Sequence, residues 1–221
     1  MGRGRVSGAL RRRIWGATRS RVREPPFRYH ALWFTGTRDP FPRDRLTWDV
    51  RPYLAIYSLL GVRYFVTPNT WPFPLDLPKA YEGEVTIYEN PGAIPRARVV
   101  HVVERVSTVE EALRRLGRPS HDPRSTAVVV GIGDDVTAGR PSNPGSAIIT
   151  RYESTRVVVR TKTDRPGLLV LTDTSDEGWR AWIGGRPTRI ELADGAFRGV
   201  WVPAGEHDVT FEYEPDGCRT G

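Results

Sequence analysis

The spacing of hydrophobic and polar residues divides the chain into a mixed first part and a strand-rich second part. From residue 49 to residue 60, apolar side chains beginning at Tyr53 recur at i, i+3, i+4 and i+7, the spacing of one helix face. Gly61 follows this pattern, at a position where glycine can end a helix in a left-handed conformation. Residues 62–67 then alternate with a two-residue period, which predicts a strand directly after the helix.

The first part continues with short strands and a second helix. Three strands are predicted, at residues 85–89, 97–106 and 126–130. Ser107 and Glu110 have the spacing of a capping box, in which both side chains satisfy backbone donors in the first turn of a helix. A helix is therefore expected to begin after Ser107 and to stop at Gly117. These elements together predict a small α+β unit over residues 29–135.

Regularly spaced strands fill the second part, which follows a linker-like stretch at residues 136–146. Seven strands are predicted, at residues 147–153, 156–163, 167–174, 179–183, 187–192, 196–202 and 208–214. Turn residues separate them, and Gly184-Gly185 is suited to a two-residue hairpin. The pattern predicts an antiparallel β-sandwich over residues 147–215, followed by a tail at residues 216–221. The expected fold class is therefore α+β and mostly β, with the small α+β unit preceding the sandwich.

The positive charge is concentrated at the beginning of the chain. The formal net charge is +7, and residues 1–28 alone carry nine arginines against one acid, Glu24, which leaves the remaining residues at −1. Such a basic tail is compatible with anionic lipid headgroups, with nucleic-acid phosphates, or with a solvated leader that has no partner. An arginine-rich organellar transit peptide is a further alternative. Because the remainder is nearly neutral, nucleic acid is not the expected partner.

Few of the residue patterns that catalytic or metal sites require occur in the sequence. Cys218 is the single cysteine, which excludes an intramolecular disulfide framework and a cysteine-built zinc site. The motifs of serine hydrolases, phosphate-binding loops and zinc metalloproteases are missing. We therefore expect no cofactor, no metal and no enzymatic activity from this chain acting alone. The longest apolar stretches, such as residues 55–62, are also too short to cross a bilayer.

Three carboxylates lie close together immediately before Gly178: Asp173, Asp176 and Glu177. Their oxygens are of the type that a hard cation such as calcium prefers. Aspartate and serine also favour turns, so the same stretch is compatible with a solvated β-turn, which we prefer. The three acids are in addition candidates for contact with a glycan.

Tryptophans recur in the strand-rich part. The face of the strand on which each side chain is expected to lie separates two roles. Trp179 and Trp201 are expected to fill the core between two sheets, the commoner role for such large side chains. Trp182 is offset from its apolar neighbours Ala181 and Ile183, so it is expected to face outward, where an indole ring can stack on a sugar. Trp182 therefore joins Asp173 and the two other acids as a candidate glycan contact.

A series of short motifs resembles one known family in content and in order. They lie at residues 59–67, 87–97, 166–173, 178–181, 194–198, 202–207 and 209–215. The second, for example, reads Ile-Tyr-Glu-Asn-Pro-Gly-Ala-Ile-Pro-Arg-Ala. In this series the chain resembles the extracytoplasmic C-terminal region of YfhO-type bacterial membrane proteins, which are related to GT-C glycosyltransferases that use polyprenyl-phosphate sugars. It departs from the family at Gly184-Gly185, where an Asp-Gly turn is usual.

The resemblance implies a location and a role. It implies a non-catalytic extracytoplasmic accessory domain of a YfhO-like membrane protein, at the bacterial cell membrane and involved in cell-envelope glycosylation. The residues that transfer the sugar would lie in membrane helices outside this chain. The implied partners are that membrane-embedded glycosyltransferase part or the membrane surface, and a glycan or lipid-linked acceptor. The alternative is a free-standing β-sandwich carbohydrate-binding protein.

Overall fold

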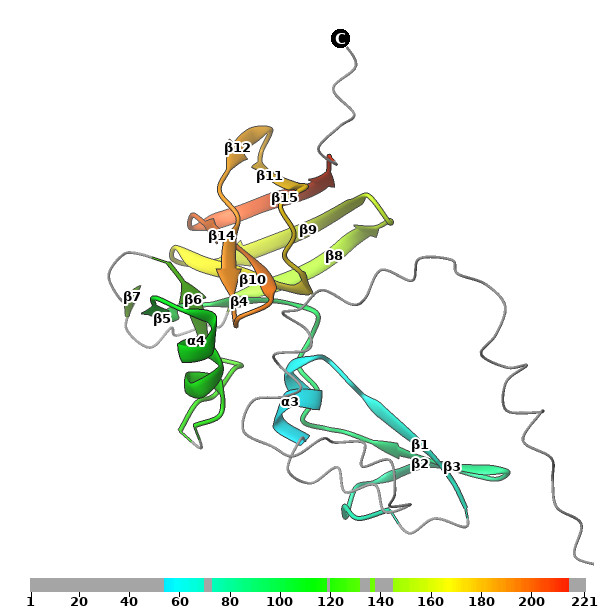
Figure 1. Ribbon diagram of the computed structural model, residues 1–221. Coiled ribbons are helices and arrows are strands. Elements are labelled where there is room, and N and C mark those ends of the chain that lie inside the picture. The colour runs from blue at the N-terminus through cyan, green and yellow to red at the C-terminus, as the bar shows by residue number, and fades with distance from the viewer. Residues whose placement is uncertain (1–53, 70–72, 119, 132–135, 138–144, 215–221) are drawn as a thin grey trace, which may run out of the picture.

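The structure, a computed structural model, describes residues 54–69, 73–118, 120–131, 136–137 and 145–214. Within these ranges the chain forms two helices and three β-sheets (Figure 1). The predicted fold class is confirmed, because the chain is mostly β and a small α+β unit precedes a strand-rich part. The predicted tails at residues 1–28 and 216–221, and the greater part of the predicted linker at 136–146, lie outside the described residues.

The first described part of the chain, up to Glu89, forms one short helix and a three-stranded sheet. The helix is α3 (Leu54–Leu59), and the sheet has the order β1-β3-β2, with β1 (Tyr64–Pro68), β2 (Lys79–Glu82) and β3 (Val85–Glu89). Gly61 has φ of +75°, so the chain leaves α3 through the left-handed conformation that the sequence predicts. Tyr57 of α3 meets Phe65 of β1 edge to face, with 5.4 Å between the ring centroids. This contact holds the helix against one face of the sheet.

The central sheet has seven strands in the order β4-β10-β14-β13-β6-β5-β7. Its strands are β4 (Ala97–Val100), β5 (Val102–Val106), β6 (Thr126–Val130), β7 (Val136–Thr137), β10 (Gly167–Thr174), β13 (Glu191–Ala193) and β14 (Phe197–Val202). Strands β5 and β6 pair in parallel, and the other pairs in the sheet are antiparallel. The sheet thereby joins strands from both sides of residues 136–146, a pairing that the local sequence pattern does not predict.

The third sheet has five antiparallel strands in the order β12-β11-β15-β9-β8. Its strands are β8 (Ser146–Tyr152), β9 (Arg156–Thr163), β11 (Trp179–Ile183), β12 (Arg186–Thr188) and β15 (Gly205–Tyr213). Gly184 and Gly185 connect β11 to β12 with φ of +54° and +80°, as expected for the predicted two-residue hairpin.

The side chains of β10 pack on both faces of the seven-stranded sheet. Leu169 and Leu171 face the five-stranded sheet and pack between the two sheets with residues such as Phe211. Leu168 and Val170 face the opposite side, where they pack with residues from the helix α4 (Val109–Leu116) and from α3. Both faces of β10 are covered, which agrees with the continuous apolar run at residues 168–171.

Two of the predicted strands are each divided between two pairing partners. The predicted strand at 97–106 is broken at His101, because β4 pairs with β10 whereas β5 pairs with β6. The predicted strand at 187–192 is likewise split, since β12 belongs to the five-stranded sheet and β13 to the seven-stranded one. His101 is buried at the break, with Nδ1 3.1 Å from the carbonyl oxygen of Pro166.

The start of α4 differs from its prediction by one residue. Thr108, not Ser107, is the N-cap, and its Oγ1 accepts a hydrogen bond from the backbone N–H of Glu111 at 3.2 Å. The backbone of Thr108 is extended, which places its hydroxyl over the first turn. The predicted end of the helix at Gly117 is confirmed.

Candidate functional site

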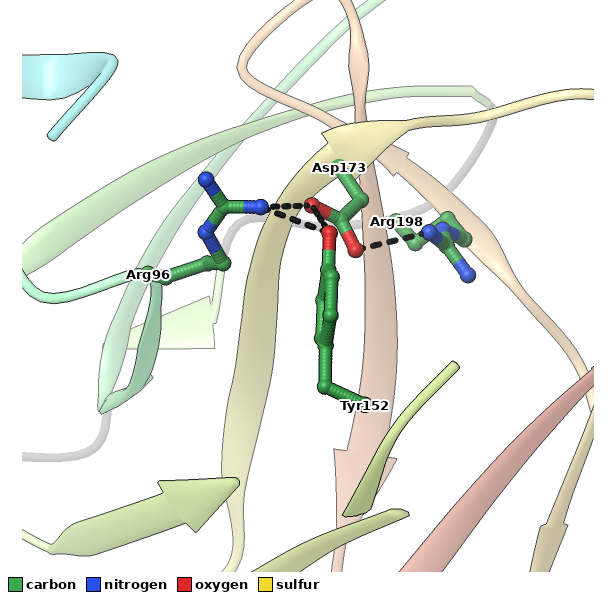
Figure 2. Close-up of polar contacts among 4 residues, drawn as sticks. All are labelled: Arg96, Tyr152, Asp173 and Arg198. Atoms are coloured by element: carbon green, nitrogen blue, oxygen red, sulfur yellow. Dashed lines mark hydrogen bonds and ion pairs between the residues drawn. The ribbon is translucent and has the colours of Figure 1, made fainter. Parts of the chain in front are cut away.

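Asp173, at the end of β10, is held by donors from three other segments (Figure 2). Its Oδ1 accepts hydrogen bonds from Arg96 Nη1 at 3.1 Å and from the hydroxyl of Tyr152 at 3.2 Å. Its Oδ2 accepts from Nη2 of Arg198 at 3.0 Å. Arg96 also donates to the Tyr152 oxygen at 2.6 Å, which closes the cluster. Asp173 is therefore bonded within the protein on both carboxylate oxygens.

The hydroxyl of Tyr152 is a stable donor in this cluster. Partial desolvation raises the pKa of the Tyr152 phenol, and the negative charge of Asp173 raises it further. The phenol consequently stays protonated at neutral pH and donates its proton to the carboxylate.

Arg198 connects this cluster to Trp179. The guanidinium of Arg198 is buried and lies over the Trp179 ring, 3.7 Å from its centroid. Such a cation–π contact is strongest where the cation is desolvated. Tyr213 packs on the same indole, with 5.3 Å between ring centroids. Trp179 is thus fixed in orientation by Arg198, which Asp173 in turn holds in place.

An open pocket of about 360 Å³ lies beside Trp179, between the turn before β11 and the segment after β12. Its principal lining residues carry an indole, an aliphatic side chain and charges of both signs: Asp176, Glu177, Trp179, Arg180, Arg189 and Ile190. An aromatic surface with a few convergent polar groups is the usual composition of a small-ligand site. Because acids and arginines are present in equal number, the lining suits an uncharged, hydroxyl-rich ligand.

The two acids of this pocket also shape the turn that precedes β11. Oδ1 of Asp176 accepts a hydrogen bond from the backbone N–H of Gly178 at 3.1 Å, which is the geometry of an Asx-turn. The carbonyl oxygen of Glu177 accepts from Arg180 Nη1 at 2.5 Å, and Glu177 itself is exposed to solvent. In the described part of the chain, no group of three or more histidine, cysteine, aspartate or glutamate side chains is placed to hold a metal ion.

The structure brings together only two of the four candidate residues that the sequence singles out. Asp176 and Glu177 line the pocket, whereas Asp173 lies in the ion cluster and Trp182 is not among the lining residues. Trp182 is on the face of β11 opposite to the core-facing Ala181, and it pairs across the sheet with Thr210. Its outward orientation agrees with its parity in the sequence.

Sequence reasoning missed the cationic half of the site. Arg180 and Arg189 line the pocket, and the buried Arg198 orients its aromatic wall. Nothing local distinguishes these side chains from the many other arginines of the chain. Trp179 packs against the core and also lines the pocket. Its position two residues after Glu177 was a sequence signal for the second role.

Comparison with known families finds a similarity in the strand-rich part. Residues 142–221 match the family model described as bacterial membrane protein YfhO. The C-terminal part of this chain is therefore similar to this family. The match confirms the resemblance over the region that contains β8 to β15, including the pocket beside Trp179. The family is described as one of bacterial membrane proteins.

No curated protein and no solved structure matches the chain. Neither helix in the described ranges is long and apolar enough to cross a membrane.

Proposed function

We propose that this chain is a non-catalytic extracytoplasmic accessory domain of a YfhO-like membrane protein involved in cell-envelope glycosylation. We further propose that the pocket beside Trp179 binds a glycan, either free or as the sugar part of a lipid-linked acceptor. The YfhO match supports the membrane-protein context. The observation that supports glycan binding is the fixed indole of Trp179, which lies next to two acids and two arginines.

The chemistry of a sugar suits this lining. A pyranose has an apolar C–H face, which packs on an aromatic ring, and hydroxyl groups that both donate and accept hydrogen bonds. The carboxylates of Asp176 and Glu177 accept from such hydroxyls, and the guanidinium groups of Arg180 and Arg189 donate to them. An indole that is already held by Arg198 loses little conformational freedom on binding.

The non-catalytic role is supported by how the polar groups around Trp179 are used. Asp173 and Arg198 bond to each other, and the side chain of Asp176 closes a turn. These interactions fix the positions of the side chains around Trp179, and those positions are suited to binding a ligand. The transfer of the sugar is accordingly assigned to a membrane-embedded partner.

The glycan site predicts a loss of binding when its exposed polar residues are removed. Glu177→Ala and Arg189→Ala should each weaken binding to an array of bacterial cell-envelope oligosaccharides by about tenfold or more, since each removes a hydrogen bond that involves a charged group. Both side chains are exposed. Arg189 also pairs with the buried Glu191 at 3.6 Å, so circular dichroism checks the fold of both variants. The matched control is Trp182→Ala, on the outer face of β11, which should bind as the wild type does.

The alternative function is a free-standing β-sandwich carbohydrate-binding protein that uses the outer face of the five-stranded sheet. Trp182, opposite Thr210 on that face, is the observation in its favour. It predicts the reverse pattern, in which Trp182→Ala abolishes glycan binding and Glu177→Ala leaves it intact.

The membrane context predicts where the native product is found. An antibody raised against residues 147–214 should detect it in the membrane fraction of lysed cells. A product that stays in the soluble fraction at low salt would contradict the proposed membrane association and favour the free-standing alternative.

A further inference from the structure

The three-stranded sheet has one covered face and one apolar face that no described residue covers. On the covered face, Phe65 is buried against Tyr57 of α3. On the other face, Val66 of β1 pairs with Ile87 of β3, which pairs in turn with Tyr81 of β2. Val66 and Tyr81 are 57% and 52% exposed. An apolar row therefore crosses all three strands on the uncovered side.

Exposed apolar side chains are concentrated on this sheet. Of the five large hydrophobic residues that are exposed in the described ranges, three lie here: Tyr64, Val66 and Tyr81. The rim charges largely neutralise each other, because Arg63 pairs with Glu89 at 3.1 Å and Lys79 pairs with Glu82 at 2.8 Å. A contiguous apolar face with a neutralised rim is typical of an interaction surface, whereas scattered single residues are not.

We propose that this face, defined by Tyr64, Val66, Tyr81 and Ile87, lies in the headgroup region of a lipid bilayer. The proposal rests on the proposed membrane-associated function. Tyrosine is suited to this position, since its ring is apolar and its hydroxyl remains in contact with water, and tyrosines are enriched at membrane–water interfaces. Valine and isoleucine on the same face supply aliphatic surface that reaches the first part of the acyl chains.

The charge of residues 1–28 and the length of the connection at residues 29–53 favour a bilayer as the partner of this face. Residues 1–28 carry nine arginines against one acid, and they connect through residues 29–53 to α3, which packs on the covered face of this same sheet. A connection of that length reaches on the order of 80 Å when extended. The arginines can therefore contact anionic headgroups next to the apolar face, at about 1 kcal/mol for each basic residue near the surface.

The fold places the proposed glycan pocket away from the proposed lipid-contacting face. Figure 1 shows the three-stranded sheet at one end of the molecule and the β11–β12 hairpin at the other. The pocket contains residues from β11 and from the segment after β12. A domain that rests on its three-stranded sheet thus presents Trp179 to glycans that extend away from the membrane.

Vesicle binding by the full chain tests this surface. The probes are vesicles of pure phosphatidylcholine and of phosphatidylcholine mixed with phosphatidylglycerol, measured by co-sedimentation. The double variant Val66→Glu/Tyr81→Glu should bind phosphatidylcholine vesicles about tenfold more weakly than the wild type, because it places two charges on the inserted face. The matched control is Ile148→Glu, which changes a residue that is 62% exposed on the five-stranded sheet and should leave binding unchanged.

Three outcomes would overturn the proposal. The wild type could fail to bind phosphatidylcholine vesicles, or the double variant could bind them as well as the wild type. Light scattering could instead show a dimer that the double variant dissociates, which would assign the face to a second copy of this chain. Each outcome is distinguishable from failure of the proposed function, since glycan binding by the Trp179 pocket is measured without lipid.

Discussion

Replacing Asp194 with alanine is expected to lower the free energy of unfolding by about 3–5 kcal/mol, because the substitution leaves a buried arginine without its counter-ion. Asp194 is fully buried, and its Oδ2 accepts from Arg98 Nη2 at 2.5 Å. Its Oδ1 accepts from the backbone N–H of Val128 at 2.8 Å, so the side chain also links the turn before β14 to β6. Equilibrium urea denaturation followed by tryptophan fluorescence measures the change.

A matched control separates burial from ion pairing as such. Asp208 also pairs with an arginine, Arg160, at 3.0 Å, but both side chains are about half exposed. Asp208→Ala should leave the stability nearly unchanged, since exposed ion pairs contribute little. Equal effects at Asp194 and Asp208 would contradict the assignment of the Arg98 pair as a buried structural contact.

Phe211→Ala is expected to destabilise the protein by a similar amount, about 3–5 kcal/mol, by opening a cavity between the two large sheets. Phe211 is fully buried and lies opposite Ala181 and Val157 on the strands at either side. The same denaturation experiment applies. Tyr81→Ala removes an aromatic side chain that is half exposed, so it should have little effect on stability and is the control. A small effect at Phe211 would mean that the sandwich does not pack as described.

The sequence predicts those strands best whose ends are determined locally. The predicted bounds of β9, β10 and β11 coincide with the observed ones. In each case turn residues lie on both sides, as Asp164-Arg165-Pro166 does between β9 and β10. Local turn chemistry and side-chain period therefore suffice to define these elements.

Strands that are divided by their distant partners are not predictable in this way. Residues 97–106 form a valine-rich stretch, and nothing within it marks His101 as a break. The break arises because β4 pairs with residues 168–171, whereas β5 pairs with residues 126–130. This information lies in sequence positions far away, which a local pattern does not contain.

The candidate site shows the same limit. Asp176 and Glu177 precede Trp179 by three and two residues in the chain, so their proximity to an aromatic wall was accessible from the sequence. Arg189 and Arg198 arrive from later segments through the pairing of the strands. In a chain so rich in arginine, composition alone gives no reason to choose these two.

The strand order of the seven-stranded sheet has a consequence for biosynthesis. Strand β4 pairs with β10 and β6 pairs with β13, although β10 and β13 are synthesised long after them. A nascent chain that has reached residue 130 therefore already contains apolar strands whose neighbours do not yet exist. Such non-local pairing slows folding and leaves unpaired strand edges prone to aggregation. The free edges of β4 and β6 accordingly stay unpaired until β10 and β13 have been synthesised.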